Sequence, residues 1–336
     1  GMQWAYSELF QEYSGLQVAG YLDHALKQCA RVGVLAHYSE THDNERLAKK
    51  GRAWSLLRNR LCALSSVNGA FGFTCGVEWL APEKLNVHSS RGLAWGSEEN
   101  IVPQLARLNR LLTDHPCFFD NATLTILSTS DDHVFALSRV SSEGLDRVLV
   151  LVNSDPKTPR VLSLESKVYE HLCSPKLDLL GQSAPVFKET PDGKTEFLLQ
   201  GGECFCLATA LVPKGLSGDG YREARAQSAW AITMISRRIH VRDISPFDWQ
   251  RMAKLVESGP QKLLAAISHL DAALVKEDVI GALDKGGDGN RYPPVDTWDL
   301  LSRRRITDVP QDHWLLIEDH APFRAVLETE EGKSPQ

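Results

Sequence analysis

The secondary-structure pattern of the chain changes near residue 118, and this change most limits what the chain can fold into. Before it, helical patterns alternate with apolar strands, as at 31–39 ("RVGVLAHYS") and 68–80 ("NGAFGFTCGVEWL"). After it, strand-like runs such as 168–173 ("VYEHLC") follow one another at spacings of about 8 to 12 residues. The first pattern is typical of a parallel sheet covered by helices, and the second of an antiparallel sandwich. We therefore predict an α/β part over 1–117 and an antiparallel β-sandwich over 118–213.

Within the first part, residues 1–30 and 46–64 are predicted to be helical, because apolar residues recur there at three- and four-residue steps. A further helix is expected from Ser97 to about Asp114, with acidic residues at its positive end. Only two strands are evident between these helices. Two parallel strands leave hydrophobic edges open and do not make a stable sheet, so we expect this part to be incomplete by itself.

The residues after the predicted sandwich form two further segments. We expect a linker and a helical segment over 214–290, in which Ser245 and Pro246 mark a helix start. Residues 291–336 are expected to be the start of a further β-rich domain. The predicted fold class is therefore α/β plus all-β.

The composition is that of an ordinary globular protein, with 43% hydrophobic and 24% charged residues and a formal net charge of -6. A phosphate-binding surface usually makes a chain basic, so this balance argues against nucleic acid as a partner. No apolar run approaches the length of a membrane span, and no signal peptide is visible. The seven scattered cysteines fit a reducing compartment. We expect a cytoplasmic protein that binds neither nucleic acid nor membranes.

The cysteines and histidines show no pattern of metal ligands. Cys204 and Cys206 form a C-x-C within a predicted strand, and we expect their side chains on opposite faces, which argues against a shared metal. His88 lies near Glu78 and Glu83 without the helical or hairpin spacing that supports a metal site. No Gly-rich phosphate-binding loop precedes a helix with Lys-Ser or Lys-Thr. We predict no metal and no cofactor.

A polar stretch follows the first strand directly. It reads "SETHDN" at 39–44 and places His42 and Asp43 where a buried strand ends. At the carboxyl end of a parallel strand, polar side chains face the crevice in which α/β proteins bind ligands. The same stretch also suits a helix start, with Asp43 or Asn44 capping a helix that begins near Glu45. The pattern alone leaves both interpretations open.

"SETHDN" resembles the fourth signature stretch of the α-amylase-type glycoside hydrolases, which are (β/α)8 barrels. In that family the stretch usually reads Asn-His-Asp at the end of the seventh strand, and Thr41 stands here in place of the Asn. The resemblance implies that Asp43 is the carboxylate that stabilises the transition state and that His42 hydrogen-bonds to the same sugar. An ionised carboxylate favours the positive charge that the sugar develops during cleavage.

The next strand supports the resemblance. Residues 68–79 are similar to the family's eighth strand, a Gly-rich run that ends in a Gly-x-Glu motif, here at Glu78. The resemblance makes Glu78 a substrate-binding candidate, together with Trp79 and Trp95, whose rings could stack on sugars. The alternative for each Trp is ordinary packing. The predicted last helix and the sandwich fit the end of the family's barrel and its C-terminal domain.

The family's nucleophile and general acid have no match before His37. The chain is therefore expected to begin in the middle of a barrel, as a fragment of a longer enzyme or as a naturally short relative. Its layout resembles bacterial glucan-degrading proteins in which an amylase-like barrel precedes a glycogen-debranching region. This implies an α-glucan or maltooligosaccharide partner, with the rest of the parent polypeptide or a second chain beside it. The alternative is a non-catalytic glucan-binding or spacer module, inactive alone without those two groups.

Overall fold

The structure is a computed structural model, in which the chain divides into two compact units, residues 1–218 and residues 219–336. The described residues are 4–7, 9, 12–86, 96–119, 121–128 and 133–286. Three sequence predictions lie outside them: those for His88, for Trp95 and for the β-rich start at 291–336.

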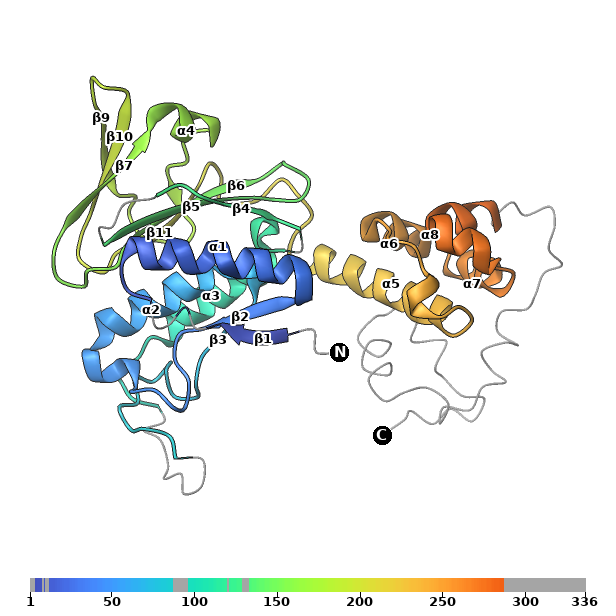
Figure 1. The fold of residues 1–336 in the computed structure, drawn as a ribbon, viewed down its shortest axis with the longest axis horizontal. Helices are drawn as coiled ribbons and strands as arrows, with labels where there is room; N and C mark the ends of the chain where they lie inside the picture. The colour runs from blue at the N-terminus through green and yellow to red at the C-terminus, as the bar shows by residue number, and fades with distance from the viewer. Residues whose placement is uncertain are drawn as a thin grey trace. The chain divides into compact units, whose positions relative to one another are not determined.

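Unit 1 begins with a three-stranded parallel sheet (Figure 1). The strand order is β1-β2-β3, and the strands span Trp4–Ser7, Val34–Tyr38 and Phe71–Gly72. Parallel neighbours need a crossover connection, which helices α1 and α2 provide here. The helices of this part are α1 (Gly15–Val32), α2 (Arg52–Leu64) and α3 (Val102–Asp114). This part is α/β, as the alternating pattern predicts.

The predicted helix over 1–30 is wrong at its beginning. The first residues form β1, which pairs in parallel with residues 34–37 of β2. Helix α1 starts only after Ser14, whose side chain accepts a hydrogen bond from the Gln17 amide (3.1 Å), while the Gln17 side chain accepts one from the Ser14 amide (3.0 Å). This capping box fixes the start of the helix. The apolar stripe that predicts the helix begins at Leu16, so it carries no information on the residues before the cap.

The other two predicted helices of this part also begin later than expected. A short 3-10 helix, η2, covers Leu47–Lys50, and α2 starts only after Gly51. Gly51 has a φ of 91°, a conformation that favours glycine, so the chain turns there. The helix expected from Ser97 starts at Val102, with Pro103 in its first turn, where proline is tolerated.

Two antiparallel sheets follow (Figure 1). One has five strands in the order β4-β5-β6-β11-β8, and the other has three in the order β7-β10-β9. The strand predicted at 168–173 is wrong, because α4 (Ser166–His171) runs there and buries Tyr169 and Leu172 at a helical three-residue step. The strand bounds are β4 Thr123–Ile126, β5 Val134–Val140, β6 Arg147–Asn153, β7 Arg160–Glu165, β8 Leu177–Asp178, β9 Val186–Glu189, β10 Lys194–Leu199 and β11 Cys204–Ala208.

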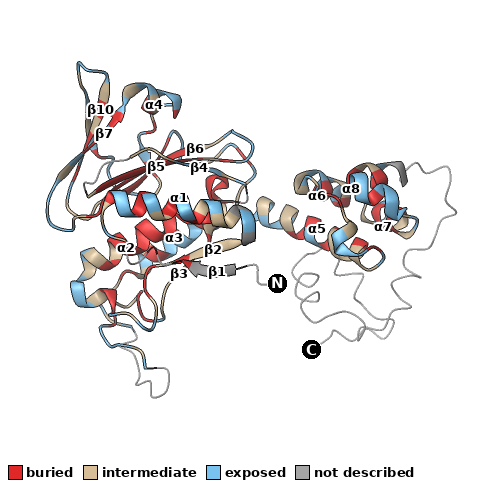
Figure 2. Ribbon diagram, viewed as in Figure 1, coloured by how far each residue is buried: buried red, intermediate tan, exposed pale blue. Residues whose placement is uncertain are grey.

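The central strands of the five-stranded sheet are buried on both faces (Figure 2). In β11, Phe205 and Leu207 lie in a core shared with the three-stranded antiparallel sheet. Cys204 and Cys206 lie instead in the core formed with α1, α2 and α3. Successive side chains of a strand alternate between faces, so residues two apart share a face. The expectation that the two cysteines point to opposite faces is therefore wrong.

Unit 2 is helical in the part that the structure describes. Its helices pack around a core of their own, which includes Trp230, Met252 and Val279. The predicted helix start at Ser245 and Pro246 is too early, because Asp248 caps the next helix by accepting a hydrogen bond from the Gln250 amide (2.9 Å). None of the described helices of either unit has the length and apolar character to cross a membrane. The helices are α5 Gly218–Ser236, α6 Trp249–Ser258, α7 Pro260–Ser268 and α8 Ala272–Gly286.

Candidate functional site

Two loops leave the carboxyl ends of the neighbouring strands β2 and β3, and we call them the strand-end loops. The first, residues 39–47, carries His42 and Asp43, and the second, residues 73–80, carries Glu78. The two strands pair in parallel, so both loops start at the same edge of the sheet. In open α/β sheets this edge is where ligands bind.

Two hydrogen bonds join the strand-end loops. The Thr74 hydroxyl donates to the carbonyl oxygen of Glu40 over 3.1 Å. The Nη2 of Arg46 donates to the carbonyl oxygen of Cys75 over 3.0 Å. The structure thus brings together the two segments that the sequence identifies from separate motifs.

A buried ion pair fixes the base of the first loop. The Nε of Arg46 lies 3.1 Å from Oε1 of Glu40, and both side chains are only 2% exposed. The other carboxylate oxygen of Glu40 accepts a hydrogen bond from the Leu47 amide over 2.7 Å. Burial raises the pKa of Glu40, while the Leu47 amide and the Arg46 charge act in the opposite direction. Separating such a pair leaves an uncompensated buried charge, so it holds both ends of the loop together.

Sequence reasoning missed this ion pair. Glu40 and Arg46 lie in a stretch rich in charged residues, which ordinarily predicts a solvated surface. The signal that marks them is their burial, which becomes visible only when both strand-end loops are folded over them. The residues that the sequence does single out, His42 and Asp43, lie between them at the exposed end of the loop.

His42 and Asp43 occupy this exposed tip. Their side chains are 53% and 82% exposed, and the Nε2 of His42 lies 3.4 Å from Oδ1 of Asp43. The turn that carries them is closed by Asn44, whose side-chain oxygen accepts hydrogen bonds from the amide (3.2 Å) and the hydroxyl (2.6 Å) of Thr41. Asn44 thus closes the turn, and the partner of the Asp43 carboxylate among the described residues is His42.

The alternative interpretation of this stretch, a helix cap, is wrong. The helix that follows is the 3-10 helix η2, which begins at Leu47. Its cap position is Arg46, which makes no side-chain capping bond within the described residues, and neither Asp43 nor Asn44 is placed to cap it. Asp43 therefore does not serve as a cap of this helix.

Glu78 and Trp79 lie in the turns that follow β3. Oε2 of Glu78 accepts a hydrogen bond from the Gly76 amide (3.0 Å), and the Glu78 carbonyl accepts one from the Ile101 amide (2.9 Å). Glu78 thus connects the second loop to the start of α3. The Trp79 amide donates to the Gly76 carbonyl over 3.2 Å, and its side chain is half-buried. Both residues are in the loop joined to that of Asp43, but the Glu78 carboxylate also has a local structural partner.

His37 in β2 precedes the first loop and is fully buried. Burial lowers the pKa of this histidine to about 4, with a smaller lowering from the charge of Arg139 and an opposing effect of the Cys62 carbonyl. The imidazole is therefore neutral at physiological pH. Its burial excludes direct contact with a ligand in the strand-end loops.

The thiols do not add a metal site to this edge. All seven cysteines lie in described residues and are free. Cys204 is fully buried, and burial raises the pKa of its thiol to about 12, so it stays protonated. Within the described ranges, no group of three or more His, Cys, Asp or Glu side chains is arranged to hold a metal ion.

The solved structures that are similar to this chain include two α-amylases and a debranching enzyme. The α-amylase from H. orenii has a TM-score of 0.47 and 12% identity, covering 62% of this chain and 49% of that one. The maltogenic α-amylase AmyB from Thermotoga neapolitana has a TM-score of 0.48 and 15% identity, covering 62% and 51%. The debranching enzyme from Nostoc punctiforme has a TM-score of 0.43 and 15% identity, covering 57% and 38%.

The chain therefore spans about half the length of the first two of these solved structures. Neither a protein-family model nor a curated protein matches the sequence. The solved structures named above are two α-amylases and a debranching enzyme.

Proposed function

We propose that the chain is part of an α-glucan-acting glycoside hydrolase or glucanotransferase of the α-amylase type. In this proposal Asp43 stabilises the transition state, and His42 hydrogen-bonds to the same sugar. The observation that carries the proposal is the position of Asp43. Its carboxylate is 82% exposed at the carboxyl end of a parallel strand, in a loop whose base is fixed by a buried ion pair.

The physical chemistry of the first strand-end loop suits this role. The cleaved sugar develops positive charge, and a carboxylate held nearby lowers the energy of that state. Such stabilisation is largest when the charged group is already oriented and need not be reorganised during the reaction. The Glu40–Arg46 pair and the Asn44 turn supply this orientation, and His42 offers a hydrogen-bonding nitrogen beside the carboxylate.

We further propose that residues 1–117 are the last part of a (β/α)8 barrel and that residues 118–213 are the sandwich that follows it. Three parallel strands with helical crossovers support this assignment. Among the described residues, β1 and β3 each have a neighbour on one side only. An open edge exposes unpaired backbone groups that favour a further strand. The rest of the parent polypeptide or a second chain would supply the remaining strands. Trp79 would contact the sugar, and Trp95, outside the described residues, stays a substrate-binding candidate from the sequence.

A second candidate is a glucan-binding module without catalytic activity of its own. Retaining glycosidases use two carboxyl groups about 5 Å apart. In the described parts of the strand-end loops, Glu40 is buried in its ion pair, Glu78 accepts from Gly76, and Glu45 pairs with Lys49. Asp43 is left as the exposed carboxylate, and its contact among the described residues is with its neighbour His42. The chain alone is therefore expected to bind glucan without hydrolysing it.

Titration of the 336-residue chain with maltoheptaose tests the shared core of both candidates. We expect saturable binding by calorimetry, weakened at least about tenfold by Asp43→Asn or by His42→Ala. The matched control is Asp23→Asn, which removes an exposed carboxylate on α1 that pairs with Lys27 and should leave binding unchanged. Equal binding by all variants would place the sugar elsewhere, and release of shorter sugars by the chain alone would contradict the non-catalytic candidate.

A further inference from the structure

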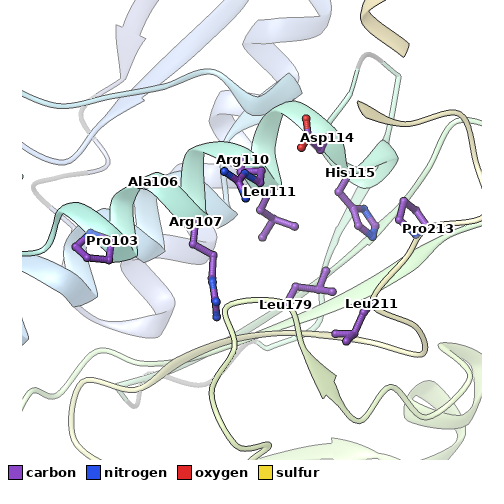
Figure 3. Close-up of a pocket in the computed structure, with 10 residues that line it drawn as sticks. All are labelled: Pro103, Ala106, Arg107, Arg110, Leu111, Asp114, His115, Leu179, Leu211 and Pro213. Carbon is purple, nitrogen blue, oxygen red and sulfur yellow. The ribbon is translucent and has the colours of Figure 1, made fainter. Parts of the chain in front are cut away.

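A cavity of about 480 Å³ in unit 1 shares no residue with the strand-end loops (Figure 3). It lies between α3 and the segments that follow β8 and β11. Its volume falls within the range of small-molecule sites, which are about 300 to 1,000 Å³. None of the motif residues that carry the α-amylase resemblance lines it.

The guanidinium group of Arg107 is held in place at this cavity. Its Nη1 donates a hydrogen bond to the Leu180 carbonyl over 2.8 Å. A Cβ atom at Gly181 would lie 1.4 Å from the same nitrogen, so the guanidinium lies against a backbone position that only glycine permits. Arginine has five N–H donors, and the bond to Leu180 uses one of them. The fixed group can therefore bind a ligand without first losing side-chain freedom.

Arg110 adds a second positive charge one helical turn further along α3. Among the described residues, neither Arg107 nor Arg110 forms an ion pair with a carboxylate. Asp114 is the acidic residue of the lining. Two guanidinium groups against one carboxylate leave the cavity net positive, and arginine binds phosphate and carboxylate groups through paired hydrogen bonds.

His115 provides a further donor at the end of the cavity. It is 5% exposed, and its Nδ1 accepts a hydrogen bond from the Cys117 amide over 3.3 Å. A neutral imidazole that accepts at Nδ1 carries its proton on Nε2. Burial lowers the pKa of His115 to about 4, so this neutral form is present at physiological pH. Figure 3 shows the ring beside Pro213, on the cavity side of the helix end.

The remaining wall is apolar. Leu111, Leu179, Leu211 and Pro213 line it, and Figure 3 shows the side chains of Leu179 and Leu211 approaching each other below the helix. Leu211 is 65% exposed, so in this structure it keeps much of its apolar surface in contact with water. Removing that surface from water would favour a ligand with an apolar body.

We propose that this cavity binds a small organic anion. Its phosphate or carboxylate group pairs with Arg107 and Arg110, Nε2 of His115 donates a further hydrogen bond, and its apolar body covers Leu179 and Leu211. The proposal is independent of the glucan site, because the two sites share no residue.

Calorimetric titration of the intact chain with phenyl phosphate, benzoate and benzyl alcohol tests the proposal. The three probes share a ring and differ in the anionic group, so we expect one or both anions to bind at millimolar concentration or below and the alcohol not to bind. Arg110→Gln should weaken binding at least about tenfold with an unchanged melting temperature, because its guanidinium has no partner among the described residues. Arg107→Gln should weaken it similarly. Arg31→Gln, which removes an exposed arginine of α1, is the matched control.

Two results would overturn the proposal. The first is that neither anion binds at concentrations up to about 10 mM. The second is that both pocket variants bind the anions as tightly as the Arg31→Gln control. Tight binding of benzyl alcohol would show that the cavity is an apolar site, which also contradicts the role given to the arginines.

Discussion

The five-stranded antiparallel sheet and the parallel sheet of unit 1 are covered to different degrees (Figure 2). Every residue of β11 is buried, and so is nearly every residue of β5 and β6. In β2 only His37 is buried, and both residues of β3 are half-buried. Burial of apolar area is the main source of stability. The antiparallel sheet therefore contributes more to the stability of unit 1 than the parallel sheet does. The exposed charges of the candidate site follow the less covered sheet.

The difference separates two tasks in one unit. A sheet covered on both faces gives rigidity but offers no surface to a ligand. The parallel sheet is less covered, and the strand-end loops of the proposed site leave its carboxyl edge. The two are linked by Arg139, a fully buried residue of β5 that reaches the end of α2. Mutations in the two regions should therefore differ in size and in what they change.

The largest effect is expected for Arg139→Ala, because this side chain joins the two regions. It donates hydrogen bonds to the carbonyls of Cys117 (2.8 Å), Leu64 (2.9 Å) and Ser66 (2.8 Å). Each buried carbonyl left without a donor costs about 1–3 kcal/mol, so we expect a loss of about 5 kcal/mol in urea unfolding. The control is Arg147→Ala in β6, which should cost less than about 1 kcal/mol. A similar small loss for Arg139→Ala would show that the regions are not joined there.

A pair of core truncations compares the two sheets directly. Phe205 of β11 is 2% exposed, whereas Leu35 of β2 is half-buried. We expect Phe205→Ala to cost about 4 kcal/mol and Leu35→Ala about 1 kcal/mol, because a half-buried side chain loses less buried area. Denaturant unfolding of both variants measures the difference. Equal losses would contradict the division of stability between the sheets.

Two buried histidines of unit 1 make stability depend on pH. His37 lies in β2 and His115 follows α3, and burial lowers both folded-state pKa values from 6.5 to about 4. The unfolded state therefore binds protons that the folded state excludes, and stability should fall as the pH drops from about 6.5 to about 4. Each residue contributes up to about 3 kcal/mol. The free energy of unfolding of His115→Gln should fall less steeply with decreasing pH than that of the unaltered chain. An identical fall would show that His115 does not contribute to the pH dependence.

An effect of similar size is expected for Glu40→Gln. The amide keeps an acceptor for the Leu47 amide but leaves the buried charge of Arg46 without its partner. We expect a loss of about 3 kcal/mol, at the low end of the cost of breaking a buried ion pair, together with weaker glucan binding. Glu45→Gln, which removes the exposed pair with Lys49, should change stability by less than about 0.5 kcal/mol. If Glu40→Gln lowers stability but leaves glucan binding unchanged, the ion pair does not support the proposed binding site.

The sequence predicts those features that depend on neighbours along the chain. Continuous apolar runs such as Val148–Val152 indicate strands buried on both faces, and the alternation before residue 118 indicates an α/β part. The strand Trp4–Ser7 is too short to show a period, and it is a strand only because β2 lies beside it. The segment Ser166–His171 has the apolar content of a strand, but its packing in the folded unit makes it a helix.

The candidate site likewise contains residues that the sequence identifies and residues that only the fold identifies. His42 and Asp43 can be found from a local motif, because the signature stretch is contiguous. The Glu40–Arg46 pair cannot, since its burial depends on Thr74 and Cys75 of the second loop. The cavity is further from any sequence signal, because Arg107, Leu179 and Leu211 meet only in the folded unit.

In the proposed function Asp43 acts in catalysis rather than in folding, and turnover of an α-glucan by the intact natural protein tests this role most directly. For Asp43→Asn we predict a fall in kcat of at least about a hundredfold, with an unfolding midpoint equal to that of the unaltered protein. The matched variant Asp23→Asn should keep full turnover. A kcat for Asp43→Asn within about twofold of the unaltered protein would contradict the claim.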